Sequence, residues 1–558
     1  MMLPTSIAIW LAVISNIGEA AYVNLPFQKR WYDHQNRPLS ENKSYLTIKN
    51  RNIHVKRESP DAYFQVETKF NQLFYEVELE IGSQKDPVTL LLDTGSSDII
   101  INTANNPECQ AADVDNDQNV QNLQKRNAPV DVICIQASAT KIISDSIASS
   151  NSDISANRNT SDYPRLNKTI KYASDNDDYL MAIAPKVDPL YDCYSFGVFN
   201  YSESNSFEIT NVPLDIEYYD GSGAVGIYGK DTIYLNDVEI PYTTIGLNTK
   251  SYLAKGVLGI GFNFNENAFQ NGYPKYESFP EHLKTLGLTN RAVYSIYGVY
   301  GKRNSILFGA YDKSAYIEEK GLTLIPIVAY NPGTKVGEGP FYVSVTLSSI
   351  SFTSSKLSNE IIASGNAIAL LDTGASYSTV PYYVLNEILT KFDFKWSSQL
   401  ETFVISESDI PKDQTFLTFN FQSAKVEIPL IDFTYPIIDG QTLSNTGLRS
   451  ISIEGGDDDR FILGDDFLSS VYLIVDQEAQ SAALGQANPN KDDTNIQIVE
   501  NTIIDAIKSP EYDEVYNNSD HGRLMLTTVD NPNHIQTIES FGQNIQLYQP
   551  GLGNDLKW

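Results

Sequence analysis

Two short segments of this sequence share a pattern of residues that can carry acid–base chemistry. Residues 90–97 read Leu-Leu-Leu-Asp-Thr-Gly-Ser-Ser, and residues 370–376 read Leu-Leu-Asp-Thr-Gly-Ala-Ser. If folding brings Asp93 and Asp372 within a few ångströms of each other, the two carboxyl groups cannot both ionise and must share one proton. The ionised carboxylate can then take a proton from a water molecule, while the protonated one donates to a carbonyl oxygen. The pair therefore predicts hydrolysis of an amide bond by water, without a covalent intermediate.

The residues that follow each aspartate suit this role and are predicted to support the dyad. Gly95 and Gly374 permit a tight turn and a close approach of the two backbones. Thr94 and Thr373 can hydrogen-bond across the junction, and the Ser96 hydroxyl can donate to the first carboxylate. One Asp-Thr-Gly is compatible with an ordinary turn, but two copies that each follow an apolar run indicate a shared function.

The segments around the two motifs repeat as well. Each motif ends an apolar run that is typical of a buried strand, and each is followed by two apolar residues and a glycine. Gly259 follows Asp93 by 166 residues, and Gly464 follows Asp372 by 92 residues. Removing an insertion of 83 residues at 110–192 leaves 83 residues in the first copy, which is close to the spacing in the second. The sequence therefore predicts two related β lobes, each presenting one aspartate.

The N-terminus has the features of a secreted protein. Residues 1–20 contain an apolar run that ends at small residues, which predicts a signal peptide; the alternative is a buried strand. Residues 21–57 contain two dibasic pairs and are predicted to be the pro-segment of a zymogen. We expect an extracellular glycoprotein, because Asn-x-Ser/Thr sequons at Asn42, Asn159, Asn167, Asn200 and Asn517 agree with a secretory route. We also expect a monomer.

Beyond the pro-segment the composition is that of a β protein. There are 34 Tyr and 24 Phe beside many Val, Ile and Thr. Residues 58–325 are predicted to form an N-terminal lobe with a solvated insertion loop at 110–192, and residues 326–488 a C-terminal lobe. Residues 489–558 are polar and are predicted to form a tail, which lacks the apolar end of a GPI anchor signal. We expect an all-β fold with two lobes and a cleft between them.

Charge and motif content argue against other functions. The formal net charge of −30 disfavours nucleic acid as a partner. The histidines do not cluster and no cysteine has metal-ligand spacing, so we expect neither a metal nor a cofactor. Residues 221–226 match a Gly-x-Gly-x-x-Gly dinucleotide pattern, but the residues that follow are typical of a strand, whereas a nucleotide site needs a helix. A Gly-x-Ser-x-Gly nucleophile motif is absent from the sequence.

These motifs resemble the pepsin family of aspartic proteases, and within it the fungal yapsin, barrierpepsin and candidapepsin groups. The resemblance runs from about residue 63 to residue 488, outside the insertion. It implies a bilobal pepsin-like fold, catalytic roles for Asp93 and Asp372, and a cleft that binds an extended peptide. It also implies a flap, a hairpin that folds over the substrate, at residues 216–223, with substrate-binding residues Tyr218, Asp220, Gly221 and Ser222.

The sequence departs from the family pattern at two positions near the motifs. Ile100 stands where the family usually has a tryptophan that anchors the flap tyrosine. Ala375 stands where most members carry Thr or Ser. Because a hydrogen bond to an ionised carboxylate lowers its pKa, its loss at Ala375 predicts a dyad that keeps its shared proton to higher pH. Activity that extends towards neutral pH is therefore expected.

The cysteines and the insertion carry further expectations. Cys109 and Cys193 bracket the insertion as the loop cysteines do in yapsin-like enzymes, which implies that they form a disulfide and leave Cys134 over. Cleavage after the dibasic pair Lys125-Arg126 would give two chains joined by this disulfide; the alternative is an uncut loop.

Together these features predict a secreted aspartic endopeptidase that acts on proteins or peptides. In similar fungal enzymes, acidic groups around the cleft accompany cleavage beside Lys or Arg, so Asp220 predicts a preference for basic residues. The alternative from another class is a catalytically silent protein on the same fold that binds peptides or proteins in its cleft.

Overall fold

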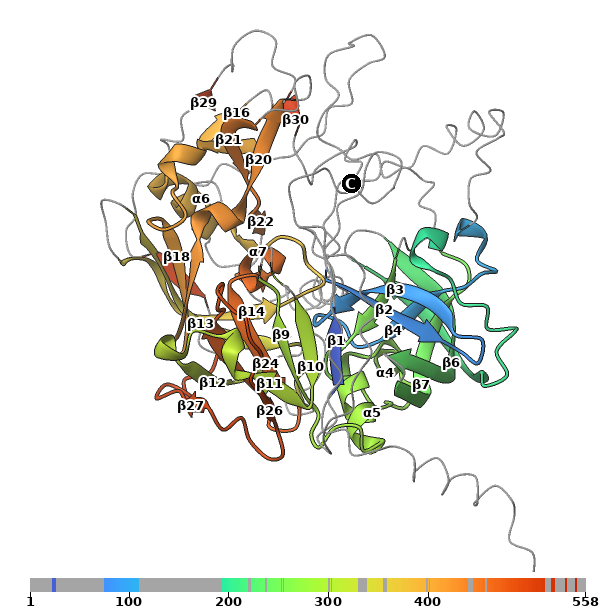
Figure 1. The fold of residues 1–558 in the computed structure, drawn as a ribbon. Coiled ribbons are helices and arrows are strands. Elements are labelled where there is room, and N and C mark those ends of the chain that lie inside the picture. Colours follow the sequence, from blue (N-terminus) through green and yellow to red (C-terminus); the bar gives the residue numbers. More distant parts are fainter. Residues whose placement is uncertain are drawn as a thin grey trace, which may run out of the picture.

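The computed structural model in Figure 1 describes only part of the chain. The described residues are 23–26, 75–109, 193–218, 222–235, 238–251, 253, 255–299, 302, 304–329, 339–354, 359–397, 400, 402–439, 445–456, 459–516, 523–526, 537–538 and 547–548. Several predictions concern residues outside these ranges. They are the signal peptide, most of the pro-segment, the insertion loop with Cys134 and Lys125-Arg126, and the flap residues Asp220 and Gly221.

A seven-stranded sheet forms the N-terminal lobe, in the order β2-β3-β8-β4-β7-β6-β5. Strands β3 and β8 pair in parallel, and Asp93 at the end of β3 lies opposite Gly259 of β8. Side chains of β3 and β8 near the aspartate are buried, as the apolar runs in the sequence predict. The strands are β2 (Glu76–Ile81), β3 (Asp86–Asp93), β4 (Ile99–Asn102), β5 (Glu208–Glu217), β6 (Gly223–Leu235), β7 (Val238–Asn248) and β8 (Gly256–Gly259).

The C-terminal lobe repeats this arrangement around the second motif. Strand β14 pairs in parallel with β23, with Leu371 opposite Leu463, so the second aspartate also follows a strand that has a parallel partner. The main sheet contains β13 (Ser344–Thr353), β14 (Glu360–Leu371), β15 (Thr379–Pro381), β18 (Phe416–Phe421), β19 (Ala424–Pro429), β22 (Glu454–Gly456), β23 (Phe461–Leu463) and β28 (Leu524–Leu526). A second sheet contains β16 (Lys395–Ser397), β17 (Thr402–Ser406), β20 (Thr434–Asp439), β21 (Asn445–Ile451), β29 (Thr537–Ile538) and β30 (Leu547–Tyr548).

A third large sheet takes strands from both sides of the predicted lobe boundary. Strand β9 pairs with β24, which joins residues near 295 to residues near 474. In Figure 1 strands β1, β9 and β10 lie between the two other groups of strands. The order is β1 (Val23–Pro26), β10 (Ser305–Phe308), β9 (Val293–Tyr297), β24 (Val471–Asp476), β25 (Ser481–Gln486), β12 (Leu322–Pro326) and β27 (Ala506–Lys508). We call this the shared sheet.

Helices are few among the described residues, and the all-β class predicted from the sequence is confirmed. Helix α5 begins at a capping box formed by Ser278 and Glu281, which satisfies backbone N–H groups in its first turn. The α-helices are α4 (Asn267–Gln270), α5 (Phe279–Thr285), α6 (Tyr382–Lys391) and α7 (Asp465–Leu468). The short 3₁₀ helices include η1 (Pro107–Cys109) and η3 (Cys193–Phe196), which flank the insertion.

The segment after residue 488 differs from the polar tail that the sequence predicts for residues 489–558. Strand β26 (Ile496–Ile498) pairs with β11 (Ala310–Asp312), and β27 pairs in parallel with β12 at one edge of the shared sheet. Val499 and Ile503 are buried in a core cluster with residues of the shared sheet. Because edge pairing uses backbone groups, it needs few apolar side chains, and the composition of this segment therefore looked like that of a tail.

The two adjacent isoleucines after β26 allow a test of this packing. The side chain of Ile503 is 6% exposed and that of Ile504 is 76% exposed. We expect Ile503→Ala to lower the free energy of unfolding by about 2–4 kcal/mol, because it leaves a cavity in the core. Ile504→Ala should change it by less than about 0.5 kcal/mol. Urea unfolding of both variants measures this, and equal effects would show that the segment is not packed.

Candidate active site

The two aspartates of the repeated motifs lie at equivalent places in the two lobes. Asp93 is the last residue of β3, and Asp372 follows β14 directly and donates its backbone N–H to Leu463 O of β23 at 3.0 Å. Both side chains are 1% exposed. The local sequence explains this position, because each apolar run forms a buried strand that ends where the polar motif begins.

The threonines of the two motifs interlock across the junction of the lobes. Thr94 donates its hydroxyl to Leu371 O at 2.7 Å and accepts the Thr373 N–H at 2.9 Å. Thr373 does the reverse, since its hydroxyl donates to Leu92 O at 2.8 Å and accepts the Thr94 N–H at 3.0 Å. All four bonds are buried, so each would be costly to break. The structure thus brings together the two motifs, which lie 279 residues apart in the chain.

The two carboxyl groups are in direct contact. The side chain of Asp372 hydrogen-bonds that of Asp93. An ideal Cβ atom on Gly95 would lie 2.6 Å from Asp372 Oδ1, and one on Gly374 would lie 2.6 Å from Asp93 Oδ1. Glycine is therefore required at both positions, because no side chain fits between the motifs. The same glycines donate their N–H groups to Asp93 Oδ1 at 2.7 Å and to Asp372 Oδ1 at 2.8 Å.

The surroundings of the two carboxyl groups differ in one hydroxyl. Ser96 Oγ donates to Asp93 Oδ2, whereas the equivalent position next to Asp372 is the buried Ala375. Burial raises the pKa of Asp93, and the hydrogen bonds from Ser96 and Gly95 oppose this rise. Burial raises the pKa of Asp372 well above its usual value, and the adjacent Asp93 raises it further. Burial therefore favours the neutral form of both carboxyl groups, and the hydroxyl beside Asp93 makes Asp93 the more easily ionised member of the pair.

Two further aspartates near the dyad were missed by the sequence analysis. Asp465 and Asp466 begin α7, immediately after Gly464 of the second repeat, and both are buried. Asp466 accepts hydrogen bonds from the Ser378 and Ser452 hydroxyls, yet burial raises its pKa to about 6. The charge of Asp465 also raises the pKa of Asp372. The signal was present in the sequence, as two acidic residues directly after a buried strand.

The predicted flap is a hairpin of β5 and β6. Tyr218 donates its N–H to Ser222 O at 2.8 Å, which closes the end of the described hairpin. The Tyr218 side chain is 3% exposed and belongs to a cluster that includes Ile100 and Tyr228. Ile100, which stands where the family usually has tryptophan, therefore supports the flap by apolar packing.

A buried carboxylate behind this cluster was also missed from the sequence. Asp98 Oδ1 accepts hydrogen bonds from the hydroxyls of Tyr228 and Tyr276, each at 2.6 Å, and Asp98 Oδ2 accepts the Asn267 N–H at 2.9 Å. Burial raises the pKa of Asp98, and these hydrogen bonds oppose the rise. Burial also raises the pKa of nearby Glu266 to about 9, which keeps it neutral at lower pH. Asp98 ties β6 of the flap to the start of β4.

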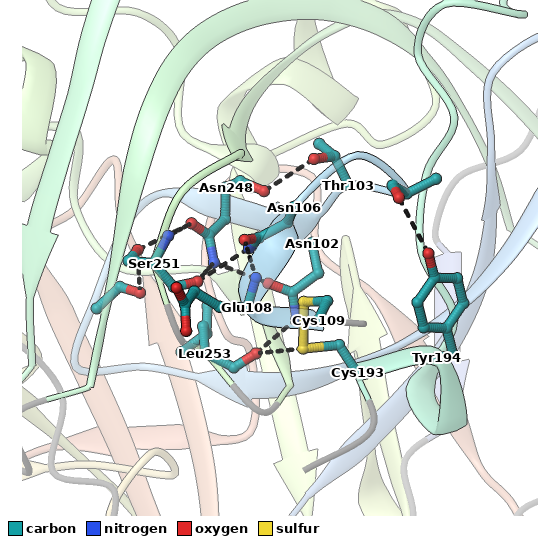
Figure 2. Close-up of a disulfide and its surroundings, with 12 residues drawn as sticks. Asn102, Thr103, Asn106, Glu108, Cys109, Cys193, Tyr194, Asn248, Ser251 and Leu253 are labelled. Atoms are coloured by element: carbon teal, nitrogen blue, oxygen red, sulfur yellow. Dashed lines mark hydrogen bonds between the residues drawn. A yellow bond between two sulfur atoms is a disulfide. The ribbon is translucent and has the colours of Figure 1, made fainter. Parts of the chain in front are cut away.

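The disulfide implied for the insertion is present. Cys109 of η1 and Cys193 of η3 are bonded, 84 positions apart in sequence, and both are buried. Figure 2 shows the disulfide beside Leu253 and a group of asparagines. Closing a loop of this length removes entropy from the unfolded chain and fixes both ends of the insertion. In the part of the chain that the structure describes, no group of three or more His, Cys, Asp or Glu residues could hold a metal ion.

Comparison with known proteins agrees with this geometry. The family model described as eukaryotic aspartyl protease matches residues 177–487, which is more than half of the 558 residues. The chain therefore belongs to the eukaryotic aspartyl protease family, and it is an aspartic-type peptidase. This confirms the family resemblance that the two motifs predict.

The similar proteins include three from the yeast Saccharomyces cerevisiae. Aspartic proteinase 3 is 28% identical to this chain, over 90% of this chain and 84% of that protein. Aspartic proteinase yapsin-3 is 27% identical, over 62% of this chain and 68% of that protein. Barrierpepsin is 24% identical, over 77% of this chain and 62% of that protein. A crystal structure of aspartic proteinase from Irpex lacteus aligns with a TM-score of 0.48 and 15% identity, over 75% of this chain and 97% of that chain.

The difference between Ser96 and Ala375 predicts a pH dependence with two separate limbs. Removing the Ser96 hydroxyl should raise the lower apparent pKa of the pair, so Ser96→Ala moves the acidic limb of activity to higher pH. Adding a hydroxyl beside Asp372 should lower the upper apparent pKa, so Ala375→Thr moves the basic limb to lower pH. Each shift should be about one pH unit, which corresponds to about 1.4 kcal/mol. Profiles of kcat/KM against pH with unmoved limbs would contradict this account.

Proposed function

We propose that this protein is a secreted aspartic endopeptidase in which Asp93 and Asp372 are the catalytic residues. The observation that supports this most directly is the buried, hydrogen-bonded pair of carboxyl groups, contributed by two interlocked motifs. A protein that only bound peptides would gain nothing from burying two carboxyl groups in contact, because their repulsion costs stability when both are ionised.

The mechanism follows from the unequal protonation of the pair. Asp93, as the carboxylate, takes a proton from a water molecule while the water oxygen attacks the carbonyl carbon of the substrate. Asp372, as the acid, gives its proton to the carbonyl oxygen, which forms a neutral tetrahedral diol. Asp93 then returns its proton to the departing nitrogen, and one diol hydroxyl returns a proton to Asp372. The carbon–nitrogen bond breaks, and the pair regains its starting protonation.

The flap is proposed to complete the binding site. An extended peptide can lie between the lobes and form strand-like hydrogen bonds with the hairpin of β5 and β6. Tyr218 and Ser222 are bonded at the described end of this hairpin, and the Tyr218 side chain packs in the cluster that contains Ile100. Such binding reads the backbone of the substrate, so it suits cleavage within a polypeptide chain.

Removing either carboxyl group of the pair should abolish catalysis. We expect Asp93→Asn and Asp372→Asn to lower kcat/KM for peptide cleavage by about 10²–10⁴ or more, because each removes a general acid or base. Asp432→Asn is the matched control, since Asp432 pairs with Lys412 on the surface and should leave the rate unchanged. The measurement is cleavage of a peptide library by each purified variant. Equal rates in the wild type and both dyad variants would refute the enzyme assignment and favour a silent binding protein.

A preference for basic residues near the scissile bond is a finer proposal. It is supported by the net charge of −30 and by Asp220, two residues after Tyr218 in the flap sequence. A partly buried carboxylate facing Lys or Arg contributes about 1–3 kcal/mol, so Asp220→Ala should lower the ratio of Lys to Leu cleavage by about 5-fold or more. Asp215→Ala, on β5, is the control. An unchanged ratio in Asp220→Ala would show that another residue sets specificity.

Secretion and processing complete the proposal. No helix among the described residues is long and apolar enough to cross a membrane. We expect removal of the signal peptide and pro-segment, and cleavage at Lys125-Arg126, to leave two chains joined by Cys109–Cys193. Gels of the secreted protein should show one band without reductant and two bands with it. A single full-length mature band under reduction would contradict complete cleavage of the insertion.

A further inference from the structure

The end of the flap has a sheet partner on one side only. Pairing of β6 with β5 extends to Gly223 opposite Glu217, whereas pairing of β6 with β7 begins only at Gly226 opposite Asn248. The hairpin therefore projects beyond the end of β7. A two-stranded hairpin is only marginally stable on its own, so its direction must be set by other contacts at its base.

The turn after β7 supplies these contacts. Val225 donates its N–H to Ser251 Oγ at 2.8 Å and, at the longer distance of 3.2 Å, to Asn248 Oδ1. Ser251 Oγ lies 2.8 Å from Gly223 O. Thr249 donates its N–H to Val225 O at 2.9 Å. Asn248 Oδ1 lies 2.9 Å from Ser251 Oγ and accepts the Ser251 N–H at 3.2 Å, which fixes the serine. Backbone groups of the projecting strand are thus bonded to one short turn.

A chain of buried amides connects this turn to the disulfide, as Figure 2 shows. Asn248 Nδ2 donates to Asn102 Oδ1 at 2.9 Å, and Asn102 Nδ2 donates to Leu253 O at 2.6 Å. Leu253 O lies 3.5 Å from Cys193 Sγ, which is a van der Waals contact because a disulfide sulfur carries no hydrogen. The disulfide therefore packs directly against the carbonyl group that holds Asn102.

A second connection reaches the other half-cystine. Asn106 Nδ2 donates to Ser251 O at 2.9 Å, and the Cys109 N–H donates to Asn106 O at 3.1 Å. Asn102, Asn106 and Asn248 are at most 2% exposed. Buried amides with satisfied hydrogen bonds are rigid, because moving one would leave its partners without water or protein to replace the bond.

We propose that Asn248 and Ser251 are positioning residues that set the direction of the flap, and that the Cys109–Cys193 disulfide braces them from behind. This inference rests on the proposed function, since the flap matters only if it covers a substrate. The disulfide then has a role beyond closing the insertion: when it is reduced, the bracing is lost and the flap base becomes mobile. Substrate binding weakens, while the dyad, which touches none of these residues, keeps its chemistry.

The first experiment removes one hydroxyl from the turn. In Ser251→Ala, KM for a peptide substrate should rise by about 10-fold, with kcat within about 2-fold of wild type, since each lost hydrogen bond has a modest net value. The Val225 amide should exchange its hydrogen by about 10-fold faster. Ser206→Ala is the matched control, because Ser206 Oγ donates to Asp231 near the opposite end of β6. The conservative variant Ser251→Thr should restore both values.

The second experiment tests the bracing by the disulfide. Replacing both Cys109 and Cys193 by Ser should also speed exchange of the Val225 amide and raise KM, without moving the pH limbs that belong to the dyad. Unchanged exchange at Val225 in Ser251→Ala would overturn the positioning role. Unchanged exchange and KM in the double cysteine variant would overturn the bracing. Hydrogen exchange at Val225 is measured without substrate, so it tests the positioning role alone. A failure of the proposed function would appear instead as peptide cleavage that does not depend on Asp93, so the two failures can be told apart.

Discussion

The exchange of hydrogen bonds between Thr94 and Thr373 is the interaction on which the remainder of the site depends. Each hydroxyl donates to the carbonyl just before the opposite aspartate and accepts the N–H of the opposite threonine. Four buried bonds therefore fix two strands from different sheets at one separation. That separation brings the carboxyl groups into contact and leaves no room for a side chain at Gly95 or Gly374. The perturbed pKa values of the pair follow from this spacing and from its burial.

The backbone of the site is nearly symmetric, but its protonation is not. Both aspartates end buried strands that have parallel partners, and both accept an N–H from their own glycine. Two side chains favour the charge on Asp93, because the two groups compete for one proton: the Ser96 hydroxyl, absent at Ala375, donates to Asp93, and the charge of Asp465 raises the pKa of Asp372. The symmetry of the repeated backbone therefore does not give the two carboxyl groups the same surroundings.

Much of this arrangement could be predicted from the sequence, because repeated motifs and apolar runs act locally. The paired Asp-Thr-Gly segments and the β class had such signals, whereas the Cys109–Cys193 disulfide was implied by the resemblance to yapsin-like enzymes. No local sequence signal indicated the hydrogen bonds around Asp98 or those of the asparagines near the disulfide, because the bonded residues are far apart in the chain. The packing of residues 489–516 was missed for a related reason: edge pairing depends on backbone groups, which leave no pattern in composition.

The shared sheet has a consequence for how the protein is made. Its central strands β9 and β24 come from residues near 295 and 474, and one of its edges is closed by β27 at residues 506–508. During synthesis from the N-terminus, the first lobe can form early, but this sheet cannot be completed until nearly the whole chain has emerged. The two halves of the dyad then meet late. The order of translation itself keeps the growing chain from being a protease while it is still unfolded and most easily cut.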